Sequence, residues 1–292
     1  MILLTGATGT VGSALLRRLV SAGEPVRCLV RDPRGLGEQR VRVQIALGDL
    51  ADPPSFRNAL RGVGTVVHLA ASIRDQPGGS IEELNAVATL RLVRAAERAG
   101  ARRFLFFSAM GARHHSRTRF FRAKALAQEA VQESALETMV FQPSIVYTPG
   151  DPWLTLLERF SYLPALPVSG SGRAQYQPIW AEDVADCVLA ALMATGRRRR
   201  TFELGGPETL SYDDIVRAAL EATGRRRPLL HVPLPVVRAS LRALRPVAGP
   251  KVFATWEEAE LMEEPLTSPR GTADAEALGV RPLPMAAVLG TA

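Results

Sequence analysis

Three glycines near the start of the chain have the spacing of a phosphate-binding turn. Gly6, Gly9 and Gly12 follow the apolar residues 1–5 and open a segment with helical periodicity. The first glycine permits a tight turn, the second lets the backbone approach a pyrophosphate, and the third allows close packing of helix on strand. Unpaired N–H groups at the helix start attract phosphate. We therefore expect a dinucleotide to contact Gly6, Thr8, Gly9, Thr10, Val11 and Gly12.

The next apolar run ends on the two residues that select between nicotinamide dinucleotides. Residues 25–30 read as a strand, and Arg31 and Asp32 follow it. An acid at this point holds the ribose hydroxyls of NAD, whereas an arginine accommodates the 2′-phosphate of NADP. Arg31 favours NADP(H), and Asp32 keeps NAD(H) as the alternative.

Two further strand ends carry residues suited to the adenosine half of the cofactor. Asp49 and Leu50 follow the third expected strand, and we expect them beside the adenine. Ala70 and Ala71 follow the fourth strand, and their small side chains would let the backbone pass close to the adenine ribose.

Strands and helices alternate over the first half of the chain. Strands are expected at residues 1–5, 25–30, 41–47, 65–69, 103–107 and 138–142, with helices at 11–22, 53–60, 81–99 and 118–134. This alternation is typical of an α/β fold with a Rossmann-type, doubly wound parallel sheet. We expect a dinucleotide-binding domain over residues 1–147, with strand and helix contributions from 178–206. Residues 148–292 would form a small lobe and a C-terminal segment.

Composition narrows the class of protein. The chain has 292 residues, 47% of them hydrophobic, and a net charge of +7. Cys28 and Cys187 lie far apart, without metal-ligand spacing, and are expected to be reduced core residues. No membrane span or nucleic-acid site is expected, so we predict a cytoplasmic protein. The arginine runs 197–200 and 225–227 are expected to be solvated; if they share a face, they suit an acidic protein or the inner surface of a membrane.

Taken together, these motifs make the chain similar to the extended and atypical short-chain dehydrogenase/reductases. The matching segments are TGATGTVG at 5–12, LVRDP at 29–33, GDL at 48–50, HLAA at 68–71, RFLFFSAMGA at 103–112, PSIVYTPGD at 143–151 and QPIWAEDVA at 177–185. FRAKALAQEAV at 121–131 and FELGGPETLSY at 202–212 resemble the branch that contains an accessory subunit of respiratory complex I and its bacterial relatives.

The resemblance implies a catalytic Tyr-x-x-x-Lys pair, and this chain departs from it. Lys124 matches the lysine, which holds the nicotinamide ribose, but Phe120 stands at the tyrosine position and has no proton to transfer. Ser108 lies one or two residues before the usual serine position, and we expect it to bond backbone beside the cofactor. Pro143, Ser144 and Ile145 would contact the nicotinamide amide.

Several other groups could replace the missing acid. His114, His115, Tyr147 and Tyr176 are candidates, each with a structural alternative, and Trp180 could close the cleft with apolar surface.

The favoured hypothesis is an NAD(P)(H)-binding protein with a degenerate catalytic site and a cofactor-sensing, accessory or assembly role. The alternative is an NADPH-dependent oxidoreductase that acts on an apolar substrate such as a quinone. A nucleotide-sugar epimerase or dehydratase ranks last, because that chemistry depends on the tyrosine.

Overall fold

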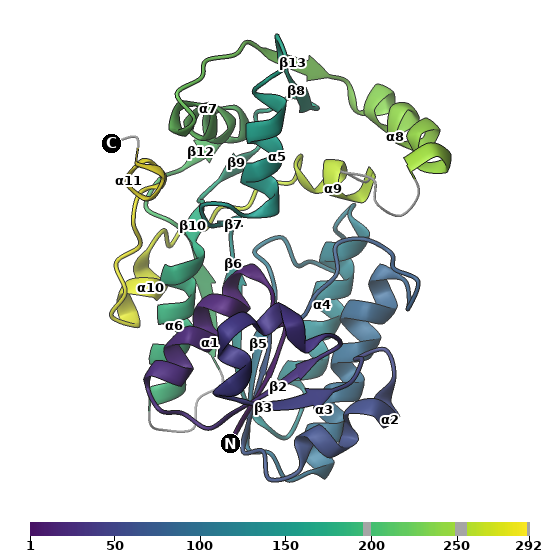
Figure 1. Ribbon diagram of the computed structural model, residues 1–292, viewed down its shortest axis with the longest axis vertical. Coiled ribbons are helices and arrows are strands. Elements are labelled where there is room, and N and C mark those ends of the chain that lie inside the picture. Colours follow the sequence, from purple (N-terminus) through teal and green to yellow (C-terminus); the bar gives the residue numbers. More distant parts are fainter. Residues whose placement is uncertain (195–199, 249–255, 291–292) are drawn as a thin grey trace.

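A seven-stranded parallel sheet forms the centre of the computed structural model, which describes residues 1–194, 200–248 and 256–290 (Figure 1). The strands lie in the order β11-β6-β5-β4-β1-β2-β3. Their bounds are β1 (Ile2–Thr5), β2 (Val26–Val30), β3 (Gln44–Leu47), β4 (Thr65–His68), β5 (Arg103–Phe107), β6 (Glu137–Pro143) and β11 (Arg200–Leu204). From β1 the chain first adds β2 and β3 on one side, and then β4, β5, β6 and β11 on the other. The order of the strands therefore reverses between β1 and β4. This confirms the expected Rossmann-type fold, and in such sheets ligands bind at the switch point.

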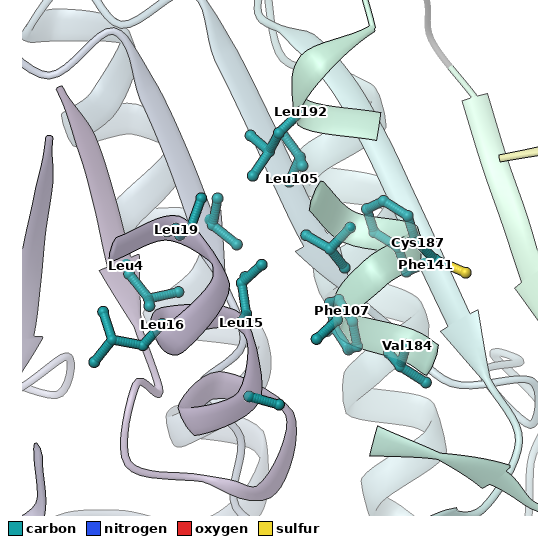
Figure 2. Close-up of a cluster of buried hydrophobic side chains, with 14 of the residues drawn as sticks. Leu4, Leu15, Leu16, Leu19, Leu105, Phe107, Phe141, Val184, Cys187 and Leu192 are labelled. Atoms are coloured by element: carbon teal, nitrogen blue, oxygen red, sulfur yellow. The ribbon is translucent and has the colours of Figure 1, made fainter. Parts of the chain in front are cut away.

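Helices cover both faces of the sheet. On one face α1 (Thr10–Ser21) packs against α6 (Ala181–Met193), and on the other α3 (Ala88–Arg98) packs against α4 (Arg119–Gln132). Figure 2 shows the first of these interfaces, where Leu15, Leu16 and Leu19 of α1 lie against the sheet. Cys187 of α6 belongs to the same buried cluster.

Neighbouring residues of one strand enter opposite cores, as the two-residue period of a strand requires. In β1, Leu3 packs with the α3 side and Leu4 with the α1 side. In β5, Phe104 and Phe106 face α3, whereas Leu105 faces α1. Burial on both faces explains why these strands are continuous apolar runs without polar alternation.

Several expected elements differ from the structure in detail. The third strand begins at Gln44, because residues before it form the 3₁₀ segment η1 (Pro33–Val41), which Asp32 caps. The helix expected at 53–60 divides into α2 (Pro53–Phe56) and the 3₁₀ turn η2 (Arg57–Leu60). A π-helical turn, η3 (Glu83–Val87), precedes α3.

The remaining elements form a lobe above the carboxyl ends of the central strands (Figure 1). A separate hydrophobic cluster holds this lobe together, with Tyr147, Tyr176 and Ile215 buried in it. The elements are β7 (Val146–Tyr147), α5 (Pro152–Phe160), β8 (Leu166–Ser169), β9 (Gln175–Tyr176), β10 (Ile179–Trp180), β12 (Leu210–Ser211), α7 (Tyr212–Ala222), β13 (Leu229–Val232), α8 (Leu234–Ala248), α9 (Trp256–Leu261) and α11 (Met285–Leu289). The C-terminal α10 (Ala273–Ala277) returns to pack beside β11.

Candidate functional site

The turn between β1 and α1 has no room for side chains at two of its glycines. Gly6 has a φ of +73°, and a Cβ there would lie 2.6 Å from the Ala70 nitrogen. A Cβ on Gly12 would overlap the Gly6 carbonyl oxygen. Gly9 caps α1 without a side-chain hydrogen bond, and the first turn of α1 contains no acidic residue. The N–H groups and positive dipole end of α1 are therefore available to a phosphate.

A cavity of about 420 Å³ opens beside this turn at the carboxyl ends of β1, β2, β3 and β4. Its size is within the range of small-molecule sites, about 300–1,000 Å³. The expected binding residues that line it are Gly6, Thr8, Gly9, Arg31, Asp49, Leu50, Ala70 and Ala71. The glycine cradle and the free helix terminus fit a dinucleotide pyrophosphate.

The remaining expected residues lie outside the lining of this cavity. Thr10, Val11 and Gly12 belong to the first turn of α1, and Gly12 is buried beneath the loop. The others follow or face β5 and β6, on the far side of β4 from this cavity. These are Ser108, Lys124, Pro143, Ser144 and Ile145.

The two residues expected to select the cofactor differ in their partners: Asp32 is ion-paired with Arg34, whereas Arg31 has no ionic partner among the described residues. The Asp32 carboxylate accepts from the Arg34 backbone N–H at 2.9 Å and from its guanidinium at 2.7 Å, and these bonds lower the pKa of Asp32. Arg31 instead donates to Gln76 Oε1 at 3.1 Å, and no carboxylate in the described ranges pairs with it. The cavity wall therefore presents an unpaired cation, whereas the neighbouring acid is already neutralised.

The sequence reasoning missed several lining residues on the segment after β4. Ser72, Gln76 and Leu84 close the cavity opposite the glycine turn. Asn85 fixes this segment: its amide nitrogen donates to the Ser72 carbonyl at 2.7 Å, and its side-chain oxygen accepts from the Ser72 N–H. No motif in residues 72–84 indicates a place in the cavity.

A buried histidine connects the strand ends under the site. His68 Nδ1 lies 2.7 Å from Thr5 Oγ1, and Nε2 lies 3.0 Å from Thr89 Oγ1. Burial, followed by the charge of Lys124, lowers the pKa of His68 to about 3. A neutral imidazole therefore ties β1 and β4 to α3, and its role is to position these elements.

Lys124 is buried in an apolar enclosure at the end of β5. Its side-chain nitrogen donates to the Phe107 carbonyl oxygen at 2.5 Å. The same nitrogen lies 4.9 Å from the centroid of the Phe106 ring and 5.8 Å from that of Phe120. Burial lowers the pKa of Lys124 to about 7, so the amine and the ammonium are both populated near neutrality.

The residues that could replace the missing acid differ in exposure and in whether their side chains already have hydrogen-bond partners. Tyr176 donates its hydroxyl to the Met262 carbonyl at 2.6 Å, so its proton is engaged in the lobe. His114 is half exposed and lies 3.7 Å from Glu129 Oε2. The hydroxyl of Tyr147 is buried and has no hydrogen-bond partner among the described residues. Burial raises the pKa of Tyr147, which makes it a poor acid.

Ser108 differs from the expectation that it bonds backbone through its side chain. Its backbone N–H does donate to the Phe141 carbonyl oxygen at 2.8 Å. Its side-chain oxygen, however, is buried without a hydrogen-bond partner in the described structure. The hydroxyl is therefore a buried polar group whose hydrogen-bonding capacity the described residues leave unused.

The segment expected at the nicotinamide is bound to the C-terminal part of the chain. Ser144 Oγ donates to the Leu266 carbonyl at 2.6 Å and accepts from the Gln177 N–H at 3.0 Å. These bonds use the Ser144 hydroxyl, and the carbonyl oxygens of Pro143 and Ile145 accept from the N–H groups of Met110 and Ile179. Trp180 is half buried against the lobe cluster.

Most of the first arginine run lies outside the described residues, so whether the two runs share a face stays a prediction. Arg197–Arg199 fall outside the described residues, and Arg200 lies over the Phe202 ring. Arg225 and Arg227 bond oxygens at the end of α5. In the parts of the chain that the structure covers, no helix is long and apolar enough to cross a bilayer, and no cluster of three or more potential ligands could hold a metal ion.

Comparisons with known proteins identify an NAD(P)H-binding domain in this chain. A family model described as NAD(P)H-binding matches residues 6–195. An NAD(P)H azoreductase from Xenophilus azovorans is 30% identical over 72% of this chain and 70% of its own length. The mitochondrial subunit 9 of the NADH dehydrogenase 1 alpha subcomplex from Arabidopsis thaliana is 27% identical over 80% of this chain, which spans 60% of that subunit.

Solved structures agree on the fold over the whole chain. A nucleoside-diphosphate-sugar epimerase from Staphylococcus aureus superposes with a TM-score of 0.81, covers 99% of both chains and shares 19% identity. At that identity the likeness concerns the fold alone. The family match, the relatives and the glycine cradle together lead to one assignment. This chain belongs to the NAD(P)H-binding family and is an atypical short-chain dehydrogenase/reductase.

Proposed function

We propose that this protein binds NADP(H) in an accessory, assembly or redox-sensing role, without the tyrosine-dependent proton transfer of the catalytic short-chain dehydrogenases. The observation that carries the proposal is the pair Phe120 and Lys124. The position that would hold the acid carries an aromatic ring, 5.8 Å from the lysine nitrogen.

The position of Lys124 suits it to hold and orient a bound dinucleotide. Its nitrogen is anchored on the Phe107 carbonyl at the end of β5, next to the switch point of the sheet. From there it can donate to ribose hydroxyls, as the family lysine does. A bound dinucleotide would supply a hydride donor, but the reduction of an ordinary carbonyl also needs a proton at the oxygen. Phe120 supplies none.

The preference for NADP(H) rests on charge at the end of β2. Arg31 lines the cavity and has no ionic partner in the part of the chain that the structure describes, whereas Asp32 is bound by Arg34. A 2′-phosphate would pair with the Arg31 guanidinium, and phosphate pairs with arginine through strong, charge-assisted hydrogen bonds. An NAD-binding site would need the Asp32 carboxylate free to accept from the ribose.

A second function, reduction of an apolar acceptor such as a quinone or an azo compound, is favoured by the apolar surroundings of Lys124. Met110, Phe120 and Ile145 pack against the lobe cluster on this side of the sheet. Reduction of a quinone takes one hydride and one proton. The aromatic anion left by hydride transfer is stabilised by its ring, so water can supply the proton. The azoreductase relative makes this class of acceptor relevant.

Oxidation of protein-bound NADPH distinguishes the two functions. The wild-type protein is loaded with NADPH, and its absorbance is followed after addition of an activated aldehyde or of a soluble quinone, with free NADPH as the background. We expect no aldehyde turnover above that background. Aldehyde reduction near the median enzyme rate of about 10 s⁻¹ would contradict the proposal. Quinone-dependent oxidation that is lost in Lys124→Met would establish the second function instead.

A further inference from the structure

Exposed apolar side chains gather at the end of the lobe that lies farthest from the N-terminus. Tyr162 and Leu163, in the loop between α5 and β8, are 69% and 43% exposed, and Leu230 of β13 is 57% exposed. Leu230 pairs in register with the exposed Pro167 of β8, and β8 and β13 lie at one end of the long axis (Figure 1). Water therefore surrounds large apolar groups at an extremity of the molecule.

Three consecutive arginines surround these side chains. The Arg225 guanidinium carbon lies 3.9 Å from the centroid of the Tyr162 ring, and its Nη1 donates to Ser161 Oγ at 2.9 Å. Arg227 Nε donates to the Leu163 carbonyl at 3.1 Å. Arg226 between them is exposed. Tyr162, Leu163, Leu230 and these three arginines are called the tip surface below.

The charges of the tip surface are not neutralised by the fold. Neutral oxygens hold Arg225 and Arg227, and no described carboxylate forms an ion pair with any of the three arginines. Arg159, Glu158 and Glu221 are exposed on the last turns of α5 and α7, next to these segments, and the exposed His231 beside Leu230 bonds the Asp213 carboxylate. Four arginines therefore stand against two glutamates, and the surface is positive.

We infer that the tip surface binds a membrane whose headgroups are anionic, such as phosphatidylglycerol. Tyrosine rings and leucines lie at the boundary between headgroups and acyl chains, and arginines beside them pair with lipid phosphates. The position at the end of the long axis lets a flat bilayer reach these side chains without contact elsewhere. This membrane contact does not depend on the proposed cofactor role.

Co-sedimentation with lipid vesicles tests the tip surface. The full-length protein is mixed with vesicles of phosphatidylcholine alone or of an equal mixture with phosphatidylglycerol, at low and at high salt. We expect binding to the mixed vesicles that weakens with salt. Each arginine near an anionic surface strengthens binding about fivefold, so the reversal Arg226→Glu should weaken it roughly 25-fold. The double change Tyr162→Ser with Leu163→Ser should also weaken it.

Matched controls separate lipid binding from folding and from net charge. Arg94→Glu changes the net charge by the same amount at an exposed position of α3, and should weaken vesicle binding by no more than about twofold. Unchanged melting temperature and NADPH binding in all variants show that each is folded. Equal weakening by Arg94→Glu and Arg226→Glu would overturn the inference. Failure of the wild-type protein to bind the mixed vesicles would also overturn it. That result would favour an acidic protein as the partner of these arginines.

Discussion

The side-chain nitrogen of Lys124 lies 5.8 Å from the centroid of the Phe120 ring, one turn earlier on the same helix. Residues four apart on a helix lie on one face, which is how a tyrosine at this position would reach the lysine. The Phe120 ring helps to enclose the lysine, but it lacks the hydroxyl whose proton a tyrosine would transfer. The lysine of the usual pair is therefore retained, whereas the position that carries the acid in catalytic family members holds a phenylalanine.

Restoring the hydroxyl tests whether the acid is the missing part. The change Phe120→Tyr should raise the rate of NADPH-dependent aldehyde reduction about 10²-fold above the wild-type background, because positioned acids contribute at least this much. Steady-state loss of NADPH absorbance measures it. Phe121→Tyr is the matched control, since Phe121 is buried on another side of α4 and should give no gain. A folded, NADPH-binding Phe120→Tyr protein without added activity would show that the site lacks more than its acid.

The buried lysine makes folding stability depend on pH. The pKa of Lys124 is about 7 in the folded protein against an ordinary value of 10.5. Between these values the unfolded chain holds the extra proton, so the free energy of unfolding rises with pH across that window. Relative to Lys124→Met, the wild type should gain a few kcal/mol between pH 7 and pH 10. Urea unfolding at several pH values measures this, and buried thiols and phenols cancel in the comparison. Parallel curves for the two proteins would refute the shifted pKa.

Gly12 tests the close packing of α1 beneath the phosphate turn. A Cβ at this position would overlap the Gly6 carbonyl oxygen, so Gly12→Ala must push the helix away from the turn. We expect a loss of about 1–3 kcal/mol in the free energy of unfolding and weaker NADPH binding. Gly64→Ala is the control, because its Cβ would meet nothing closer than 3.8 Å. If Gly12→Ala and Gly64→Ala have the same free energy of unfolding and the same affinity for NADPH, the result would be inconsistent with this packing.

Removal of Arg34 should change the choice of cofactor. Arg34 binds the Asp32 carboxylate and lowers its pKa; without it, that carboxylate can accept from a ribose hydroxyl. One such bond is worth about 1.5 kcal/mol, so the ratio of NADH to NADPH affinity should rise about tenfold in Arg34→Ala. Arg40→Ala, an exposed change on the same 3₁₀ segment, should leave the ratio as it is. A ratio that is unchanged in Arg34→Ala would mean that Asp32 does not face the ribose.

The parts of the site that lie within one βαβ unit could be predicted, because local spacing determines them. The glycine turn follows from steric limits on residues 6 and 12, and Arg31 follows from its place at the end of a strand. The pairing of Asp32 with Arg34 also has a local signal in the sequence. An aspartate before a proline is a typical helix N-cap, and here it starts η1.

The parts built by distant segments could not be predicted. Ser144 bonds the Leu266 carbonyl, 122 residues away, and Asp274 accepts from the Glu203 N–H. Gln76 meets Arg31 only because the segment after β4 folds back over the cavity. These contacts depend on how the C-terminal segment and the lobe settle on the sheet, and periodicity and spacing contain no information about that.

Titration of the purified protein with NADPH and with NADH, read by cofactor fluorescence and by the melting temperature, tests the central claim most directly. A ligand that binds only the native state stabilises it by about 2.7 kcal/mol at a hundredfold excess over Kd. We expect NADPH to bind more tightly than NADH, and Arg31→Ala to remove that preference while Arg40→Ala keeps it. Binding of neither dinucleotide, or a preference that does not change in Arg31→Ala, would contradict the account.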